Sequence, residues 1–258
     1  MRVKVDFRKT ASENAAHYYD EAKKIKKKMA GLGKAIENSE EALKRLEKEA
    51  EVKGKEGEVR IKTMRKKEWF EAFRWFVTSS GRLVVAGRDA KQNETLVSRY
   101  FEEGDLFFHA DIQGAPATIL KDGKNAGEEE MKEVAQFAGS YSSAWKVGAA
   151  SVDVYAVEKE QVKKHAVGGY IPTGGFAIIG KRIWFRNAEV GLRLGMERGE
   201  LTVIPNVTKR KLEREIAIFP GGKKKSEAAG EIAKRLGVSV DDVLGILPSG
   251  LVRVNEKV

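Results

Sequence analysis

The sequence predicts an α+β protein, with a long α-helical coiled-coil arm followed by a mainly antiparallel-sheet α/β globular domain. Apolar residues recur at alternating steps of four and three from Ala11 to Ala50, which is the spacing of a coiled-coil seam. After Trp75 the sequence pattern changes to short runs rich in β-forming residues, separated by glycine turns. Two amphipathic segments interrupt these runs early, so we expect helices packed on one face of the strands.

The predicted arm occupies residues 1–73. Eleven of its twelve heptad positions are apolar, and Lys and Glu fill most of the others. Forty residues of helix would span about 60 Å. A helical hairpin with its tip near residues 52–58 would return along residues 59–73, but that return is too short to cover the whole apolar stripe. Either the base of the arm packs on another part of the protein, or the chain forms a homodimer through the coiled coil.

Residues 74–258 form the predicted globular domain. Its carboxy-terminal part reads as two short helices, with Ser239 as the N-cap of the second. The predicted helices before these are 90–101 and 128–145. The predicted strands are 74–78, 82–86, 105–111, 117–120, 151–157, 176–179, 182–185, 190–194, 201–204 and 215–219.

The composition excludes several classes of protein. The 258 residues include no cysteine, so disulfide frameworks, thiolate metal sites and thiol nucleophiles are excluded. The sequence has no signal peptide and no run of about 18 apolar residues, so we expect a soluble, cytoplasmic protein without a membrane partner.

Positive charge is concentrated in the first third of the chain. The net charge is +10; residues 1–75 hold 21 Lys and Arg against 14 Asp and Glu, and the other 183 residues hold 27 against 24. Two acid-free cation runs lie on the arm and favour binding to RNA or another polyanion over a merely solvated helix flank. Their members are Lys23, Lys24, Lys26, Lys27 and Lys28, then Arg60, Lys62, Arg65, Lys66 and Lys67.

A dense polar cluster lies between Gly87 and Pro116. Strand alternation in "DLFFHAD" places His109 and Asp111 on one face with Phe107. A metal site would need a third ligand such as Asp89 or Glu94, and a catalytic dyad would need a nucleophile. No second nearby histidine and no nucleophile elbow supports either. A buried network that fixes a helix to the sheet remains a further alternative.

The segment from Gly175 to Lys181 has the spacing of a phosphate-binding loop. Arg182 follows in place of Ser or Thr, and the intervening residues are Phe, Ala, Ile and Ile, which suit a strand. We therefore expect a hairpin turn at Gly180 and Lys181, and no nucleotide or other cofactor.

Several ordered motifs together resemble one family. They are "KTASENAAHYY", "EWFEAFRWFVTSSGRLVVAGRDAKQNE", "GDLFFHADIQGAP", "YSSAWKVGAASVDVYAV" and "GGYIPTGGFAIIGKR". In this order they resemble the NFACT proteins, which include a bacterial ribosome quality-control factor often called fibronectin-binding. The likeness runs from about residue 6 to residue 220 and is that of an archaeal-type middle coiled coil followed by the NFACT-R domain.

The resemblance implies an RNA-binding module that acts with ribosomal RNA, the large ribosomal subunit and tRNA on stalled nascent-chain complexes. The family's amino-terminal domain and helix-hairpin-helix are absent from this sequence. We therefore expect a fragment or a shortened relative that binds but is not an enzyme. An extracellular fibronectin-binding adhesin and a metal-dependent RNA hydrolase using His109, Asp111 and Asp89 are the alternatives.

The resemblance also directs attention to the polar cluster as an RNA-facing surface, with Asp89 and Glu94 orienting Arg88 and the neighbouring backbone. Aromatic residues beside cations further along the chain would extend this surface, because such pairs suit unpaired bases and phosphates. The candidate residues are Arg88, Gln92, Asn93, His109, Asp111, Tyr141, Trp145, Lys146, Tyr170 and Lys181.

Overall fold

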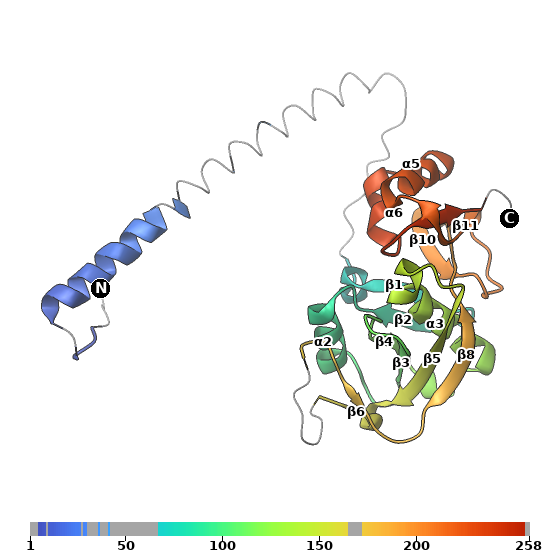
Figure 1. Ribbon diagram of the computed structural model, residues 1–258, viewed down its shortest axis with the longest axis horizontal. Coiled ribbons are helices and arrows are strands. Elements are labelled where there is room, and N and C mark those ends of the chain that lie inside the picture. The colour runs from blue at the N-terminus through green and yellow to red at the C-terminus, as the bar shows by residue number, and fades with distance from the viewer. Residues whose placement is uncertain are drawn as a thin grey trace. The chain divides into compact units, whose positions relative to one another are not determined.

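The computed structural model (Figure 1) describes residues 5–8, 10–26, 28–29, 36, 41, 67–164 and 172–255. The chain divides into two compact units, Met1–Arg65 and Lys66–Val258. The sequence pattern puts the boundary after residue 73, which is later than this division. The earlier division follows from Trp69, which stacks on Tyr100 of the second unit at 4.1 Å, and from Phe73, which is buried. Within the described residues, no helix is long and apolar enough to cross a membrane.

The first unit contains the predicted helix over residues 11–26. Thr10 begins it with a capping box, since the Glu13 amide donates to the Thr10 hydroxyl and the Glu13 carboxylate accepts from the Thr10 amide. The heptad positions Ile25 and Met29 are 56% and 66% exposed. The heptad positions Ala11, Ala15, Tyr18, Ala22 and Ile36 are exposed as well. The other five positions and the hairpin tip lie outside the described residues, so the coiled coil stays a prediction.

The second unit is built on a six-stranded antiparallel sheet (Figure 1). The strand order is β1-β2-β4-β3-β5-β8, so β3 is central and β1 and β8 form the edges. The strands are β1 (Arg74–Val77), β2 (Leu83–Ala86), β3 (Leu106–Ala110), β4 (Thr118–Leu120), β5 (Ser151–Glu158) and β8 (Ile183–Glu189).

A four-stranded antiparallel sheet follows, and α5 and α6 lie beside it (Figure 1). Its order is β10-β9-β11-β12, with β9 (Leu192–Glu197), β10 (Glu200–Pro205), β11 (Glu213–Lys223) and β12 (Val252–Val254). A small sheet pairs β6 (Val162–Lys163) with β7 (Ala177–Ile178). The helices are η1 (Trp69–Ala72), α2 (Ala90–Arg99), η2 (Gly123–Asn125), α3 (Glu128–Ser140), α4 (Ser143–Lys146), η3 (Lys159–Gln161), α5 (Lys225–Leu236) and α6 (Val240–Ile246).

The predicted antiparallel α+β architecture of the second unit is confirmed. Each of the ten predicted strands is present, with shifted ends, and Ser239 caps α6 by accepting from the Asp242 amide at 3.0 Å. The short strands β6 and β12 were not predicted, because two or three residues carry no detectable alternation.

Three local predictions are wrong. The single helix over residues 128–145 is two helices, since Ser142 donates to the Gly139 carbonyl and caps a new turn by accepting from the Ala144 amide. Gly180 and Lys181 do not close a hairpin: β7 pairs with β6 and β8 pairs with β5, so the positive φ of 78° at Gly180 turns the chain from one sheet to another.

The third wrong prediction concerns the helices, which cover both faces of the six-stranded sheet. Along β3, Leu106, Phe108 and Ala110 join the core cluster that contains α3, whereas Phe107 joins the opposite cluster with Leu96 of α2. The predicted alternation of "DLFFHAD" is thus confirmed. Both of its faces are covered, which explains why the strand is almost wholly apolar.

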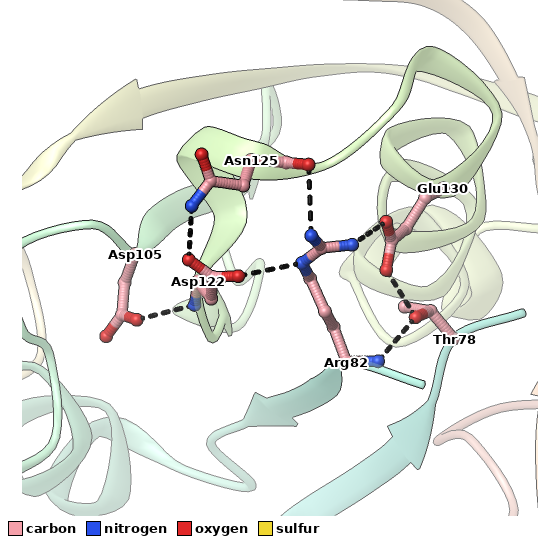
Figure 2. Close-up of polar contacts among 6 residues, drawn as sticks. All are labelled: Thr78, Arg82, Asp105, Asp122, Asn125 and Glu130. Carbon is pink, nitrogen blue, oxygen red and sulfur yellow. Dashed lines mark hydrogen bonds and ion pairs between the residues drawn. The ribbon is translucent and has the colours of Figure 1, made fainter. Parts of the chain in front are cut away.

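Buried carboxylates tie α3 to the β1–β2 turn. Arg82 donates to Glu130 at 2.7 Å, to Asp122 at 3.2 Å and to the Asn125 carbonyl at 3.0 Å, and Figure 2 marks these bonds with dashed lines. Glu130 is 2% exposed and also accepts from the Thr78 hydroxyl, which itself accepts from the Arg82 amide. A buried charge is tolerated only when it is paired and hydrogen-bonded, and here both carboxylate oxygens of Glu130 have partners.

Replacing Glu130 with alanine should therefore destabilise the protein strongly. The variant leaves the Thr78 hydroxyl without its acceptor and removes the buried partner of Arg82, which keeps Asp122 and the Asn125 carbonyl. A buried polar group that loses its partner costs about 1–3 kcal/mol. The matched control is Glu128→Ala on the same helix, whose exposed pair with Lys132 contributes at most about 0.5 kcal/mol. Urea unfolding monitored by circular dichroism measures both variants. Equal losses in the two would show that the network does not hold the fold.

Candidate nucleic-acid interface

An open cleft of about 720 Å³ lies where several loops of the second unit meet. Its walls come from the amino end of α2, the loop after β3, the amino end of α4 and residues 172–176. Residues far apart in the sequence, from Arg74 to Ser249, line it. Its described lining includes three cations, Arg74, Arg88 and Lys146, and a single carboxylate, that of Asp89.

The amino end of α2 is fixed to β4 by a close backbone contact. Asp89 caps the helix by accepting from the Gln92 amide at 2.8 Å. The Asn93 side-chain oxygen accepts from the Ala117 amide at 3.2 Å, and the Gly87 amide donates to the Ala117 carbonyl at 3.1 Å. A Cβ on Gly87 would meet the Asn93 side-chain oxygen at 2.1 Å, so only glycine fits there.

Arg88 is held by backbone carbonyls, not by the predicted carboxylates. Its guanidinium donates to the Phe73 carbonyl at 3.1 Å and to the Gly245 carbonyl at 3.0 Å. Glu94 instead pairs with Lys164 at 2.5 Å, so the prediction that it orients Arg88 is wrong. The predicted role of Asp89 on neighbouring backbone is confirmed by its cap.

Side chains from the predicted set anchor the carboxy-terminal segment 245–251 along the cleft. The Tyr141 hydroxyl donates to the Ile246 carbonyl at 2.6 Å, and the Trp145 indole donates to the Leu251 carbonyl at 3.0 Å. Lys225 of α5 donates to the Leu247 carbonyl at 2.9 Å. Because carbonyls compensate these donors without adding negative charge, the cations keep their positive field.

Arg74 lies over the Tyr141 ring, with 4.7 Å from the guanidinium carbon to the ring centroid, and donates to the Gly87 carbonyl at 2.9 Å. Burial lowers the pKa of Arg74, and the nearby charge of Arg88 acts in the same direction. Burial also lowers the pKa of Lys225, with Arg74 and Arg88 adding to the effect. Burial raises the pKa of Tyr141 to about 12, so its phenol stays neutral.

His109 contributes to an aromatic wall of the cleft. Its ring is parallel to that of Phe107, with centroids 6.1 Å apart, and lies 5.8 Å from the ring of Tyr155 on β5. Burial lowers the pKa of His109, while backbone groups of Ala110 and Ala115 and the charge of Asp111 oppose that shift. The imidazole is therefore neutral near pH 7, and the wall is apolar and aromatic.

The structure brings only part of the candidate set together. Arg88, Asn93, His109, Tyr141 and Lys146 all line the cleft. Gln92 lies just behind it, where its amide bonds to the Ala72 carbonyl and accepts from the Arg88 amide. Exposed residues outside the lining are Asp111, Lys181, Lys67, and Lys23, Lys24, Lys26 and Lys28 on the first unit. The residues Lys27, Arg60, Lys62, Arg65, Lys66 and Tyr170 fall outside those whose side chains are described.

Trp145 is a correction to the candidate set. Its side chain is 1% exposed and its only N–H group is used on Leu251, so no face is left for a nucleic acid. Sequence reasoning could not separate this core tryptophan from a surface one, because "SSAWK" places it between small residues and a lysine.

Sequence reasoning missed Arg74, Tyr155 and Phe176, which also line the cleft. A signal for Tyr155 was present, since the period of two in "SVDVYAV" puts it on the face of Asp153 and Val157. Arg74 and Phe176 gave no such signal, because their places depend on contacts with distant segments.

The proposed metal triad is not assembled, because the carboxylate of Asp89 caps α2. In the part of the chain that the structure describes, no group of three or more His, Cys, Asp or Glu side chains could hold a metal ion.

Comparison with known proteins places most of the residues that line the cleft inside a recognised domain. Residues 72–180 match the family model of the NFACT protein RNA binding domain. The chain is 38% identical over 203 residues to the archaeal Rqc2 homolog aRqcH of Methanocaldococcus jannaschii, covering 75% of this chain and 30% of that protein. It is 37% identical over 177 residues to the Homo sapiens ribosome quality control complex subunit NEMF, covering 67% of this chain and 16% of that protein.

A solved structure is also similar. The C-terminal part of the fibronectin/fibrinogen-binding protein from Streptococcus suis aligns with a TM-score of 0.40 and 18% identity, over 70% of this chain and 77% of that chain.

Substituting Gly87 with alanine should damage the α2 edge of the cleft. The added Cβ would displace Asn93 from the Ala117 amide, and such overpacking costs about 1–3 kcal/mol. The control is Gly230→Ala within α5, where a Cβ meets nothing within 4 Å and helix propensity should add up to about 1 kcal/mol of stability. Thermal unfolding compares the two variants. If Gly87→Ala is as stable as the parent, the close contact is not tight in solution.

His109 should make stability depend on pH near neutrality. Its pKa is lowered from 6.5 in the folded protein, so the unfolded chain takes up the proton first as the pH falls. Stability should therefore drop below about pH 6.5, until the folded-state pKa is passed. The stability difference between the parent and His109→Gln, which cannot titrate, isolates this effect. In urea titrations, the free energy of unfolding of the parent should fall relative to that of His109→Gln as the pH is lowered from about 7.5 to about 5. A difference that stays constant would contradict the lowered pKa.

Proposed function

Because the chain belongs to the NFACT family, we propose that it is the RNA-binding part of a ribosome quality-control factor and that the cleft is its RNA contact. One observation carries the assignment of the cleft. Arg74 and Arg88 donate to carbonyls, and among the described residues no carboxylate pairs with them or with Lys146, while an aromatic wall stands beside them. Cations that keep their charge, next to rings, suit a nucleic acid.

The relatives support the wider role. The human relative is named as a subunit of the ribosome quality control complex and the archaeal relative as an Rqc2 homolog, and the chain spans 16% and 30% of them respectively. We propose that this part binds ribosomal RNA of the large subunit and tRNA on stalled nascent-chain complexes, and that it binds without catalysing a reaction.

The first unit has further cations that would contact RNA. Lys23, Lys24, Lys26 and Lys28 are all exposed on its helical segments, where they could neutralise RNA phosphates. The exposed stripe of Ile25 and Met29 would be covered by the returning arm or by a second copy of the chain in a coiled-coil dimer.

Binding should depend steeply on salt, because phosphate neutralisation releases counterions. If about five phosphates are engaged, log affinity should fall against log salt with a slope of roughly 3 to 4 for unpaired RNA. Filter binding of ribosomal RNA and tRNA measures the slope, and co-sedimentation with separated ribosomal subunits identifies the partner. Lys146→Glu and the triple change of Lys26, Lys27 and Lys28 to Glu should each lower affinity and slope.

Lys209→Glu is the control, since Lys209 is exposed, does not line the cleft and makes only a 3.7 Å contact with Glu129. It changes the net charge by the same amount as Lys146→Glu and should leave affinity nearly unchanged. A salt-independent response, or no binding at low salt, would reject the proposed function.

A further inference from the structure

The aromatic wall of the cleft continues across the sheet to its edge strand. His109 pairs with Tyr155 between β3 and β5, and Tyr155 pairs with Trp184 between β5 and β8. The ring centroids of Tyr155 and Trp184 are 5.5 Å apart at 67°, following the 5.8 Å step from His109 to Tyr155. Three rings thus form one row across three strands, from the cleft to the outer edge of the sheet.

Arginine side chains cover the outer two rings. The Arg182 guanidinium lies 4.8 Å from the Tyr155 centroid and 5.8 Å from that of Trp184. The Arg186 guanidinium lies 4.0 Å from the Trp184 centroid. Such planar cation–aromatic stacking occupies the same faces that a nucleic-acid base would use. Both arginines are exposed, so they can move aside without disturbing the core.

A β-bulge fixes one of these arginines. Between the pairs Val152–Ala188 and Val154–Phe185, a single β5 residue faces two residues of β8. That residue, Asp153, accepts from the Asn187 amide at 2.8 Å and from Arg186 at 2.5 Å. These two donors also lower the pKa of Asp153, so its carboxylate stays ionised and holds Arg186 over Trp184.

Arg182 differs from Arg186 in its partners. Within the described part of the chain it forms no ion pair with a carboxylate, and its guanidinium lies over the two rings. Its charge is therefore available to an incoming phosphate, whereas Arg186 is partly neutralised by Asp153. One end of the row thus offers aromatic faces and an unpaired cation together.

We propose that the row His109–Tyr155–Trp184 is a stacking strip for an unpaired RNA strand, which leaves the cleft across Tyr155 and places a base on Trp184. Arg182 moves from the rings to the phosphates of the same strand. Arg186 does the same by giving up its exposed pair with Asp153, and an exposed ion pair contributes little free energy. This subsite rests on the proposed RNA binding of the cleft and specifies its ligand as single-stranded.

The geometry disfavours a duplex in this strip. Stacking needs a base face that is free, and in a duplex each face is already covered by neighbouring base pairs. Tyr155 is 7% exposed beneath Arg182, so only a flat group that replaces this guanidinium can reach its ring. An unpaired base meets that condition, and the strip reads no base edge, so it should tolerate any sequence.

The test compares an unpaired oligoribonucleotide with the same sequence in a perfect duplex, by fluorescence anisotropy on the full chain. Trp184→Ala should weaken binding of the unpaired strand about tenfold and change duplex binding little, since stacking of one base contributes that order of affinity. Trp184→Phe should retain most of the affinity, because it keeps a flat ring. Arg182→Gln should lower the salt slope, which Trp184→Ala should not.

The matched control is Phe219→Leu on β11, which removes another ring under an arginine, Arg253 at 5.2 Å, outside the strip. It should leave RNA affinity unchanged, and circular dichroism verifies that each variant is folded. If the parent binds RNA but Trp184→Ala binds unpaired RNA equally well, or the duplex binds as tightly, the stacking strip is rejected and the cleft proposal stands. If the parent binds no RNA at low salt, the proposed function fails and the strip fails with it.

Discussion

The antiparallel register of β3, β5 and β8 is the constraint on which both the core and the candidate site depend. Phe108 pairs with Ala156 and points into the core under α3, while the next pair, His109 with Tyr155, points to the cleft. A slip of one residue would exchange these sets and put a histidine into the α3 core. Because both faces of β3 are covered, such a slip would cost packing free energy on both faces. The packing of the core therefore sets the register, and the register places the three rings in a row.

Long-range hydrogen bonds to carbonyls hold the carboxy-terminal segment 245–251 along the cleft. Arg88, Tyr141 and Trp145 lie within residues 72–180, yet their donors end on the carbonyls of Gly245, Ile246 and Leu251. The carboxy-terminal segment is therefore part of the cleft. A carbonyl satisfies a donor while leaving the net charge of the cation unchanged, so this arrangement stabilises the fold and preserves a positive field.

Sequence reasoning predicted the elements of the second unit because each carries its own local pattern. The alternation in "DLFFHAD" and the cap at Ser239 need no distant partner, and both are confirmed. The Gly180 turn was misjudged because a glycine with positive φ looks the same whether its flanking strands pair with each other or with different sheets. The break at Ser142 was missed because a serine can equally lie within a helix.

Part of the candidate set lines one cleft, but the hydrogen-bond partners of its side chains were not predicted. Which carbonyl receives the Arg88 guanidinium depends on Gly245, which lies 157 residues away, and no local spacing encodes that contact. The same limit hid the buried role of Trp145 and the lining role of Arg74. In motifs rich in Arg, Asn and aromatic residues, the sequence alone thus does not distinguish side chains that hold the fold together from side chains that contact a ligand.

A side chain that holds the fold together differs from one that binds a ligand in the N–H donors and ring faces that remain without a permanent partner after folding. Trp145 has one N–H and uses it, so folding leaves it nothing to offer. Arg74 has five N–H donors and directs one to Gly87, and Arg182 has its guanidinium on rings that a base can replace. Residual donors and displaceable contacts are therefore the criterion by which we propose binding residues. By this criterion the proposed RNA-facing surface shifts from the Tyr141–Trp145 segment toward the strands β5 and β8, where the rings retain faces that folding does not permanently cover.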